Sequence, residues 1–347
     1  MTQQTANGHF PREQIYRIRA GVWHALVRMG SLRLTLWLFI LFALCIAGYY
    51  FGGQQHNGLI ITPLLLLSLN LLATIATHTT FRRQVPLLVF HLALLGMLLL
   101  LVLGRLTYLK GEAEVTSGSD FEGLLNSIDA GPLHHWPGSK LHFHLTDFSI
   151  DYAPGVQRDA TRAQVSWQDS VGNTHQGIVG DQLPLVLDNY RFYTTHNKGF
   201  AALFQWHPQG AMAQAGSIHF PSYPANEYKQ AQSWVLPGTR HEVWSQLDFD
   251  ELILDPQNTS QFRPPVEHQL ILRSGSERHL LRPGQTLQLA QGRLHYQGLG
   301  TWMGFRVFYD WTLPWLLATV LLAVLSLGWH YWVKAAARPW LNDEELS

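Results

Sequence analysis

The chain has 347 residues and a formal net charge of zero, with 24 lysines and arginines against 24 aspartates and glutamates. This balance gives no indication of a nucleic-acid partner or of a general polyanion as ligand. Charged residues make up only 14% of the chain, well below the roughly 25% of an ordinary globular protein. The single cysteine, Cys45, excludes an intrachain disulfide, a four-thiolate metal site and a Cys-x-x-Cys thiol reductant.

The first predicted element is an amphipathic helix over residues 14–31, within an N-terminal segment that covers residues 1–33. Its periodicity leaves two placements open, because such a helix lies along a membrane surface or packs against its own protein. The apolar side chains that recur at helical spacing are Ile15, Ile18, Val22, Leu26 and Met29.

Four uncharged apolar stretches predict four transmembrane helices, because each is long enough to cross roughly 30 Å of hydrocarbon. The first begins too late and is too long for a cleaved signal peptide, and no small-x-small cleavage site follows it. Ser68 and Asn70 within the second stretch are expected to hydrogen-bond to neighbouring helices. The stretches are residues 34–51, 58–77, 85–104 and 311–333.

The flanking charges predict an orientation in the cytoplasmic (inner) membrane. Residues 1–33 hold five arginines and one acid, the connection 78–84 holds Arg82 and Arg83, and the tail 334–347 holds Lys334 and Arg338. The first connection, 52–57, has no lysine or arginine. Both termini are therefore expected to be cytoplasmic, and residues 105–310 extracytoplasmic or periplasmic. Aromatic belts are expected at Tyr49, Tyr50, Phe51, Trp311 and Trp315 outside, and at Trp329, Trp332 and Trp340 inside.

Residues 105–310 read as an all-β domain, because short alternating segments are separated by turn residues. We expect antiparallel sheets in a sandwich or a partly open barrel. Residues 207–265 hold many prolines and little alternation, so they are expected to form an irregular insertion. The segments with the clearest alternation are 141–152, 163–167, 190–195, 269–272, 293–296 and 304–309.

His91 is the leading candidate for a functional residue, because it stands alone in the third apolar stretch. An ionisable group within a membrane span is costly and indicates a functional site. Imidazole is a common ligand of metals and of haem iron. His91 lies five residues past Pro86, about 8 Å along the axis from the cytoplasmic end. The alternative is a structural histidine bonded to a neighbouring helix.

Other histidines give weaker indications. His78 and His330 fall near the inner ends of the second and fourth stretches, where an interfacial role is the simpler interpretation. His142 and His144 are expected on one face of an external strand, close to His134 and His135, but no carboxylate or cysteine has matching metal-ligand spacing. Nucleotide-binding, serine-hydrolase and zinc-protease motifs are absent from the sequence, so we do not expect the chain to be an enzyme by itself.

The order of three spans, a large external β domain and a fourth span resembles the ResB (or CcsB) family of the system II cytochrome c biogenesis pathway. Departures include Gln182, where the family usually has Asn, and Trp311-Thr312, where it usually has Pro-Gly; residues 207–265 match poorly. The segments that carry the resemblance are 29–36, 90–96, 110–115, 141–152, 183–185 with 189–193, and 304–313.

This resemblance implies a haem-handling subunit. Proteins of this family act with a CcsA/ResC-like membrane protein that bears a Trp-rich motif, which this chain lacks. Together they export haem and support its covalent attachment to apocytochrome c, which a thiol reductant keeps reduced. The resemblance assigns His91 as an axial ligand of the iron of haem b, with the second ligand from the partner. Leu94, Leu95 and Leu98 share its helical face and are expected to pack against haem.

Two other classes remain open from the residues alone. The chain could be a structural membrane scaffold in which His91 is a packing residue. It could also be a metal-binding or sensing protein that uses its external histidines.

Overall fold

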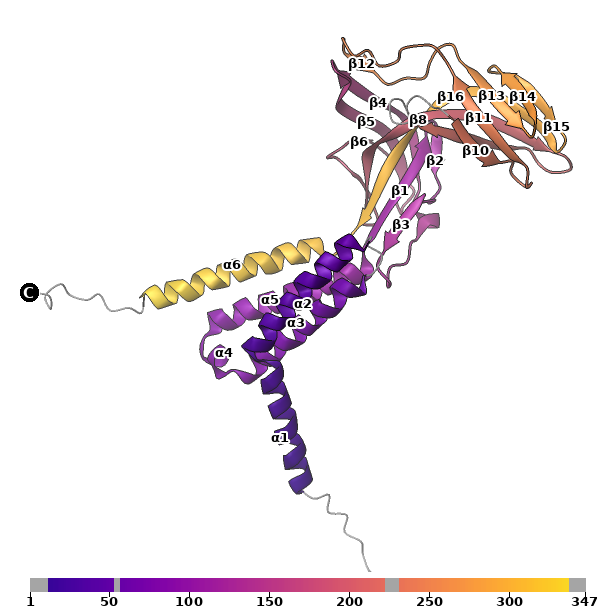
Figure 1. Cartoon of the computed structure of the whole chain (residues 1–347). Helices are drawn as coiled ribbons and strands as arrows, with labels where there is room; N and C mark the ends of the chain where they lie inside the picture. The colour runs from indigo at the N-terminus through magenta and orange to yellow at the C-terminus, as the bar shows by residue number, and fades with distance from the viewer. Residues whose placement is uncertain (1–11, 53–56, 222–230, 337–347) are drawn as a thin grey trace, which may run out of the picture. The chain divides into compact units, whose positions relative to one another are not determined.

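The computed structural model describes residues 12–52, 57–221 and 231–336, so Arg338 and Trp340 lie outside the described residues. The chain divides into two compact units (Figure 1). The helical unit holds the described residues up to Tyr108, residues 130–134 and those from Asp310 onward. The β unit holds residues 109–129 and the described part of residues 135–309.

Within the described part of the chain, four helices are long and apolar enough to cross a membrane: α2, α3, α5 and α6. The side-chain oxygen of Ser31 accepts a hydrogen bond from the Leu34 N–H and so caps the start of α2. The bounds of the six helices are α1 Arg12–Met29, α2 Leu32–Phe51, α3 Gly58–Thr77, α4 Thr79–Arg83, α5 Val85–Thr107 and α6 Leu313–Ala336.

Polar groups of α3 connect it to the start of α2. Asn70 is 3% exposed, accepts a hydrogen bond from Thr35 Oγ1 at 2.8 Å, and donates one to the Met29 carbonyl. The expectation for Asn70 is therefore confirmed, whereas that for Ser68 is wrong, because its hydroxyl bonds to Leu64 O within α3. Gly30 is required at this contact, since a Cβ there would lie 2.9 Å from Thr74 N.

The expected all-β domain is confirmed, and its sheets are antiparallel, with none closed into a barrel. Sheet A has the order β3-β1-β16-β8-β7, with β15 paired to β16 and β9 to β8. Its strands are β1 Leu109–Thr116, β3 Ser127–Ala130, β7 Leu185–Leu187, β8 Tyr190–Pro208, β9 Gln214–Pro221, β15 Thr286–Leu289 and β16 Gly292–Tyr309.

Two smaller sheets complete the β unit. Sheet B has the order β12-β4-β5-β6, with β2 paired to β4, and sheet C has the order β10-β11-β13-β14. Sheet B consists of β2 Ser119–Phe121, β4 Phe143–Ala153, β5 Gln157–Gln168, β6 Thr174–Val179 and β12 Ser260–Gln261. Sheet C consists of β10 Ala231–Val235, β11 Glu242–Asp248, β13 Gln269–Ser274 and β14 Glu277–Leu281.

Buried phenylalanines join sheets A and B. The ring of Phe143 in sheet B lies 5.2 Å from Phe121, 5.3 Å from Phe192 and 5.4 Å from Phe305 between centroids. Each of the four side chains is at most 3% exposed. Because Phe192 and Phe305 belong to sheet A, these rings form the apolar layer between two facing sheets, as in a sandwich.

The structure corrects two strand predictions. Residues 293–296 and 304–309 are parts of one long strand, β16, because residues 298–303 also pair with β8. The irregular insertion expected at 207–265 is wrong, since β9, β10, β11 and β12 lie there. The prolines of this region are compatible with strands, because Pro208 and Pro221 stand at strand ends and Pro237 follows β10. At these positions proline interrupts no central ladder of hydrogen bonds.

Candidate functional site

His91 lies nearly two turns into α5, and its ring is held in one tautomer. Its Nδ1 atom is 2.8 Å from the Leu87 carbonyl oxygen, four residues earlier in the helix. A carbonyl oxygen only accepts hydrogen bonds, so Nδ1 carries the hydrogen and Nε2 keeps its lone pair. Such a backbone bond to one ring nitrogen is how proteins orient a histidine whose other nitrogen binds a metal.

A second contact fixes the plane of the His91 ring. The Phe81 ring of α4 lies 4.5 Å from the imidazole between centroids, at 60°. Phe81 is 8% exposed, so it is itself held by the surrounding helices. The sequence analysis did not identify Phe81; its only sequence feature is an aromatic residue in a connection otherwise polar and basic.

The surface next to His91 on α5 is apolar. Leu94, Leu95 and Leu98, which follow His91 at three, four and seven residues, are each partly exposed, and Leu92 is 46% exposed. The imidazole is also partly exposed. This face therefore presents one lone-pair donor surrounded by hydrocarbon, which suits a largely apolar ligand that has a metal at its centre.

His78 and His330 differ in their surroundings. His78 joins α3 to α4, is exposed, and its ring lies 6.4 Å from the Phe81 ring, so Phe81 contacts both His78 and His91. His330 is 9% exposed on α6, and its ring packs 5.6 Å from the Tyr331 ring.

The C-terminal end of α5 is held by the guanidinium group of Arg105. Arg105 donates hydrogen bonds to Tyr49 Oη at 2.6 Å and to Asn57 Oδ1 at 3.0 Å. Its guanidinium also lies over the rings of Tyr49 and Tyr108, at 5.0 and 4.7 Å from their centroids. These contacts tie α5 to the end of α2 and to Asn57 before α3, and so keep the helix that carries His91 in place.

The histidines predicted to be external do not assemble a metal site within the described residues. His142 lies just before β4 and contacts the Ser139 carbonyl oxygen at 2.7 Å. His144 pairs with Asp120 at 2.7 Å, a carboxylate that the β2–β4 register brings opposite it and that sequence spacing did not reveal. Among the residues that the structure describes, no group of three or more His, Cys, Asp or Glu side chains could hold a metal ion.

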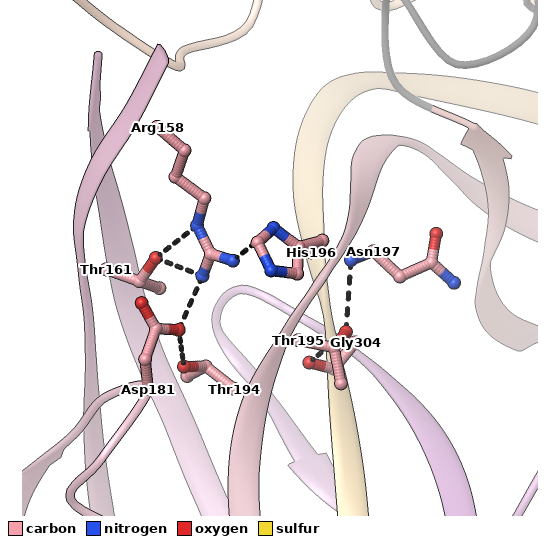
Figure 2. Close-up of polar contacts among 8 residues, drawn as sticks. All are labelled: Arg158, Thr161, Asp181, Thr194, Thr195, His196, Asn197 and Gly304. Atoms are coloured by element: carbon pink, nitrogen blue, oxygen red, sulfur yellow. Dashed lines mark hydrogen bonds and ion pairs between the residues drawn. The ribbon is translucent and has the colours of Figure 1, made fainter. Parts of the chain in front are cut away.

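The β unit contains a polar hollow of about 760 Å³ beside a bulge in β8; Figure 2 shows the polar contacts of eight residues around this bulge. Opposite the single residue Gly304, β8 has three residues, 195–197, so the strand bulges. Arg158 is 11% exposed and pairs with Asp181 at 2.7 Å, while its Nη1 donates to His196 Nδ1 at 2.8 Å. Burial lowers the pKa of the nearby Lys198 to about 8.

The fold and this site define a class: a membrane protein with apolar helices, one of which carries a lone histidine, and a large antiparallel β domain. The family model described as the ResB-like family matches residues 74–232, which include α5 and a large part of the β unit. Over these residues, somewhat less than half of the chain, this protein is similar to the ResB-like family. The match ends before the last β strands and α6. No curated protein matches the chain significantly.

Proposed function

We propose that this chain is a ResB-type subunit that binds haem b within the inner membrane and supports haem export for cytochrome c assembly. The observation that carries the proposal is the His91 ring, whose Nδ1 bonds to Leu87 O and whose Nε2 lone pair is left for iron. Haem is the cargo of this site, and His91 would be one of the two axial ligands.

The surroundings of His91 support haem more than a bare metal ion. A bare ion needs several protein ligands, and none of the described groups could supply them. Haem brings four nitrogen ligands of its own, so one imidazole from this chain and one ligand from another protein would complete the coordination of the iron. The partly exposed Leu94, Leu95 and Leu98 would cover the apolar porphyrin face.

The orientation of the helices follows from their flanking arginines. Arg82 and Arg83 lie in α4, directly before the helix that carries His91. By the positive-inside rule this connection and both termini are cytoplasmic, and the β unit is periplasmic or otherwise extracytoplasmic. His91 then lies in the inner half of the membrane, where haem arrives from the cytoplasm. The exposed apolar residues Val22, Trp23 and Val27 of α1 favour a position along the inner surface.

The chain would not complete the reaction alone. A CcsA/ResC-like partner would supply the second axial ligand and the Trp-rich haem-handling motif that this sequence lacks. The β unit would hold apocytochrome c, whose cysteines a thiol reductant keeps reduced. Its outermost strand in sheet B, β6, pairs with β5 alone among the described strands and exposes Ile178, so its other edge suits an extended polypeptide.

The test is the haem spectrum of the detergent-purified complex with a CcsA/ResC-like partner. His91→Gly is expected to lose the haem b absorption, and free imidazole is expected to restore it, because imidazole can occupy the space that the side chain leaves. His78→Gly is the matched control, since His78 contacts the same Phe81 ring but is expected to leave the spectrum unchanged.

Two results would contradict the proposal. Full haem absorption in His91→Gly would move the iron ligand to another residue. Absence of haem from every preparation, partner included, would favour the structural scaffold, in which His91 only packs against Phe81.

A further inference from the structure

Strands β1 and β9 place four polar side chains in one hydrogen-bonded network. Glu114 and Thr116 are two residues apart on β1, and Ser217 and His219 are two residues apart on β9, so each pair projects from one face of its strand. His219 Nδ1 lies 2.8 Å from Glu114 Oε2, and His219 Nε2 lies 2.8 Å from Thr116 Oγ1. Ser217 Oγ lies 2.8 Å from Thr116 Oγ1 and 3.4 Å from His219 Nε2.

When Glu114 is ionised, the donor and the acceptor of each of these hydrogen bonds are determined. An ionised carboxylate only accepts hydrogen bonds, so His219 Nδ1 carries the hydrogen and Nε2 accepts. The Thr116 hydroxyl then donates to His219 Nε2 and accepts from the Ser217 hydroxyl. Carboxylate, imidazole and hydroxyl are thus linked in the order by which serine nucleophiles are activated, with Thr116 as an intervening hydroxyl.

The imidazole is also fixed in orientation. The His219 ring stacks on Trp302 at 5.1 Å between centroids and 15° between planes. Trp302 is 3% exposed, and its indole N–H donates to Phe220 O at 2.8 Å. The side chains of His219 and Glu114 are 21% and 24% exposed, so the pair is largely shielded from water yet reachable.

A hollow of about 390 Å³ opens beside this hydrogen-bonded network. Its volume lies in the range of small-molecule binding sites. Ser217 and His219 line it, together with the aromatic side chains of Trp234 and Trp302. Asn197 of the β8 bulge also lines it, and in the described part of the chain the Asn197 side-chain amide has no hydrogen-bond partner. This amide can donate to an oxyanion that forms near Ser217.

We propose that Ser217 is an activated nucleophile and that this hollow accepts a small ester or thioester. Ser217 Oγ attacks the acyl carbon, and its proton passes through Thr116 to His219 Nε2. The carbon–oxygen or carbon–sulfur bond of the leaving group breaks, and the leaving group takes that proton. The product is an ester on Ser217, which water hydrolyses by the reverse proton path. No oxidant or reductant is needed, and the proposal does not depend on haem binding at His91.

The test is reaction of the purified full chain with a fluorophosphonate probe, followed by mass spectrometry of the labelled peptide and by release of p-nitrophenol from p-nitrophenyl acetate. Wild-type protein is expected to be labelled at Ser217, and Ser217→Ala to lose that label. His219→Gln is expected to slow labelling by about a hundredfold, the lower end of what a positioned general base contributes. Ser233→Ala is the control, because Ser233 is exposed on the adjacent strand β10.

A second pair of variants separates proton transfer from packing. Thr116→Ser keeps the intervening hydroxyl and is expected to retain most of the labelling rate, whereas Thr116→Val removes it and is expected to lose most of the rate. Tryptophan fluorescence and the thermal unfolding midpoint report whether each variant folds like the wild type. An unlabelled Ser217 in the wild type, or equal labelling in folded His219→Gln, would overturn the proposal and leave a structural hydrogen-bond network.

Discussion

Lys198 carries a buried charge, and removing that charge tests the description of its surroundings. The residue is 6% exposed, and its Nζ atom lies 5.3 Å and 5.5 Å from the ring centroids of Tyr152 and Phe262. Within the described ranges, no carboxylate or hydrogen-bond acceptor is its partner. Burial, with a smaller contribution from the positive charge of Arg158, lowers the pKa of Lys198 from 10.5 to about 8.

This pKa difference corresponds to about 3 kcal/mol of unfavourable free energy for the charged form in the folded state. The two cation–π contacts return roughly 1 kcal/mol. Lys198→Met keeps the length of the side chain without its charge, so we expect the free energy of unfolding at about pH 7 to rise by about 2 kcal/mol. The folded-state pKa lies below the unfolded value, so the folded protein loses this proton first. The stability of the wild type therefore rises relative to Lys198→Met between about pH 8 and about pH 10.5.

The assay is denaturant unfolding of the full chain in detergent, followed by tryptophan fluorescence at several pH values. Comparing the two proteins at each pH cancels the contribution of tyrosine ionisation to stability. Tyr190 is one such tyrosine, and burial raises its pKa to about 12. Lys110→Met is the control, since Lys110 is exposed on β1 and its loss is expected to change little. A Lys198→Met protein that is less stable at about pH 7, or a difference that does not change with pH, would refute the reasoning.

Three further substitutions test other contacts. Gly304→Ala is expected to destabilise the β unit by about 1–3 kcal/mol in denaturant unfolding, because the new Cβ would lie 2.6 Å from an oxygen of the β8 bulge; unchanged stability would contradict the bulge geometry. Asn70→Leu is expected to cost about 1 kcal/mol in thermal unfolding in detergent, whereas Thr62→Val, an exposed position on the same helix, should cost nothing. Phe81→Leu is expected to weaken haem retention several-fold, since the aromatic contact with His91 contributes about 1 kcal/mol; equal retention would leave Phe81 without a positioning role.

Local patterns were enough for the helices and for most of the strand segments. An apolar run of membrane length satisfies its backbone hydrogen bonds in a bilayer by forming a helix. The sequence therefore predicts α3 at its observed bounds and α2 and α5 within three residues of theirs. The long strand β16 was divided in two because Gly298 and Gly300 interrupt its alternation, and pairing with β8 overrides that interruption. Strand pairing is a tertiary property, and no local pattern gives the register that brings Asp120 beside His144.

The sequence by itself determined that His91 stands alone in an apolar span, because both its identity and its surroundings are local. It also determined the class of the fold and the family resemblance. Only the tertiary structure decided that the His91 ring packs against Phe81, because the two residues belong to different helices, α5 and α4. The same holds for the relay from Glu114 to Ser217, whose members are separated by about a hundred residues and meet only because sheet A brings β1 and β9 together.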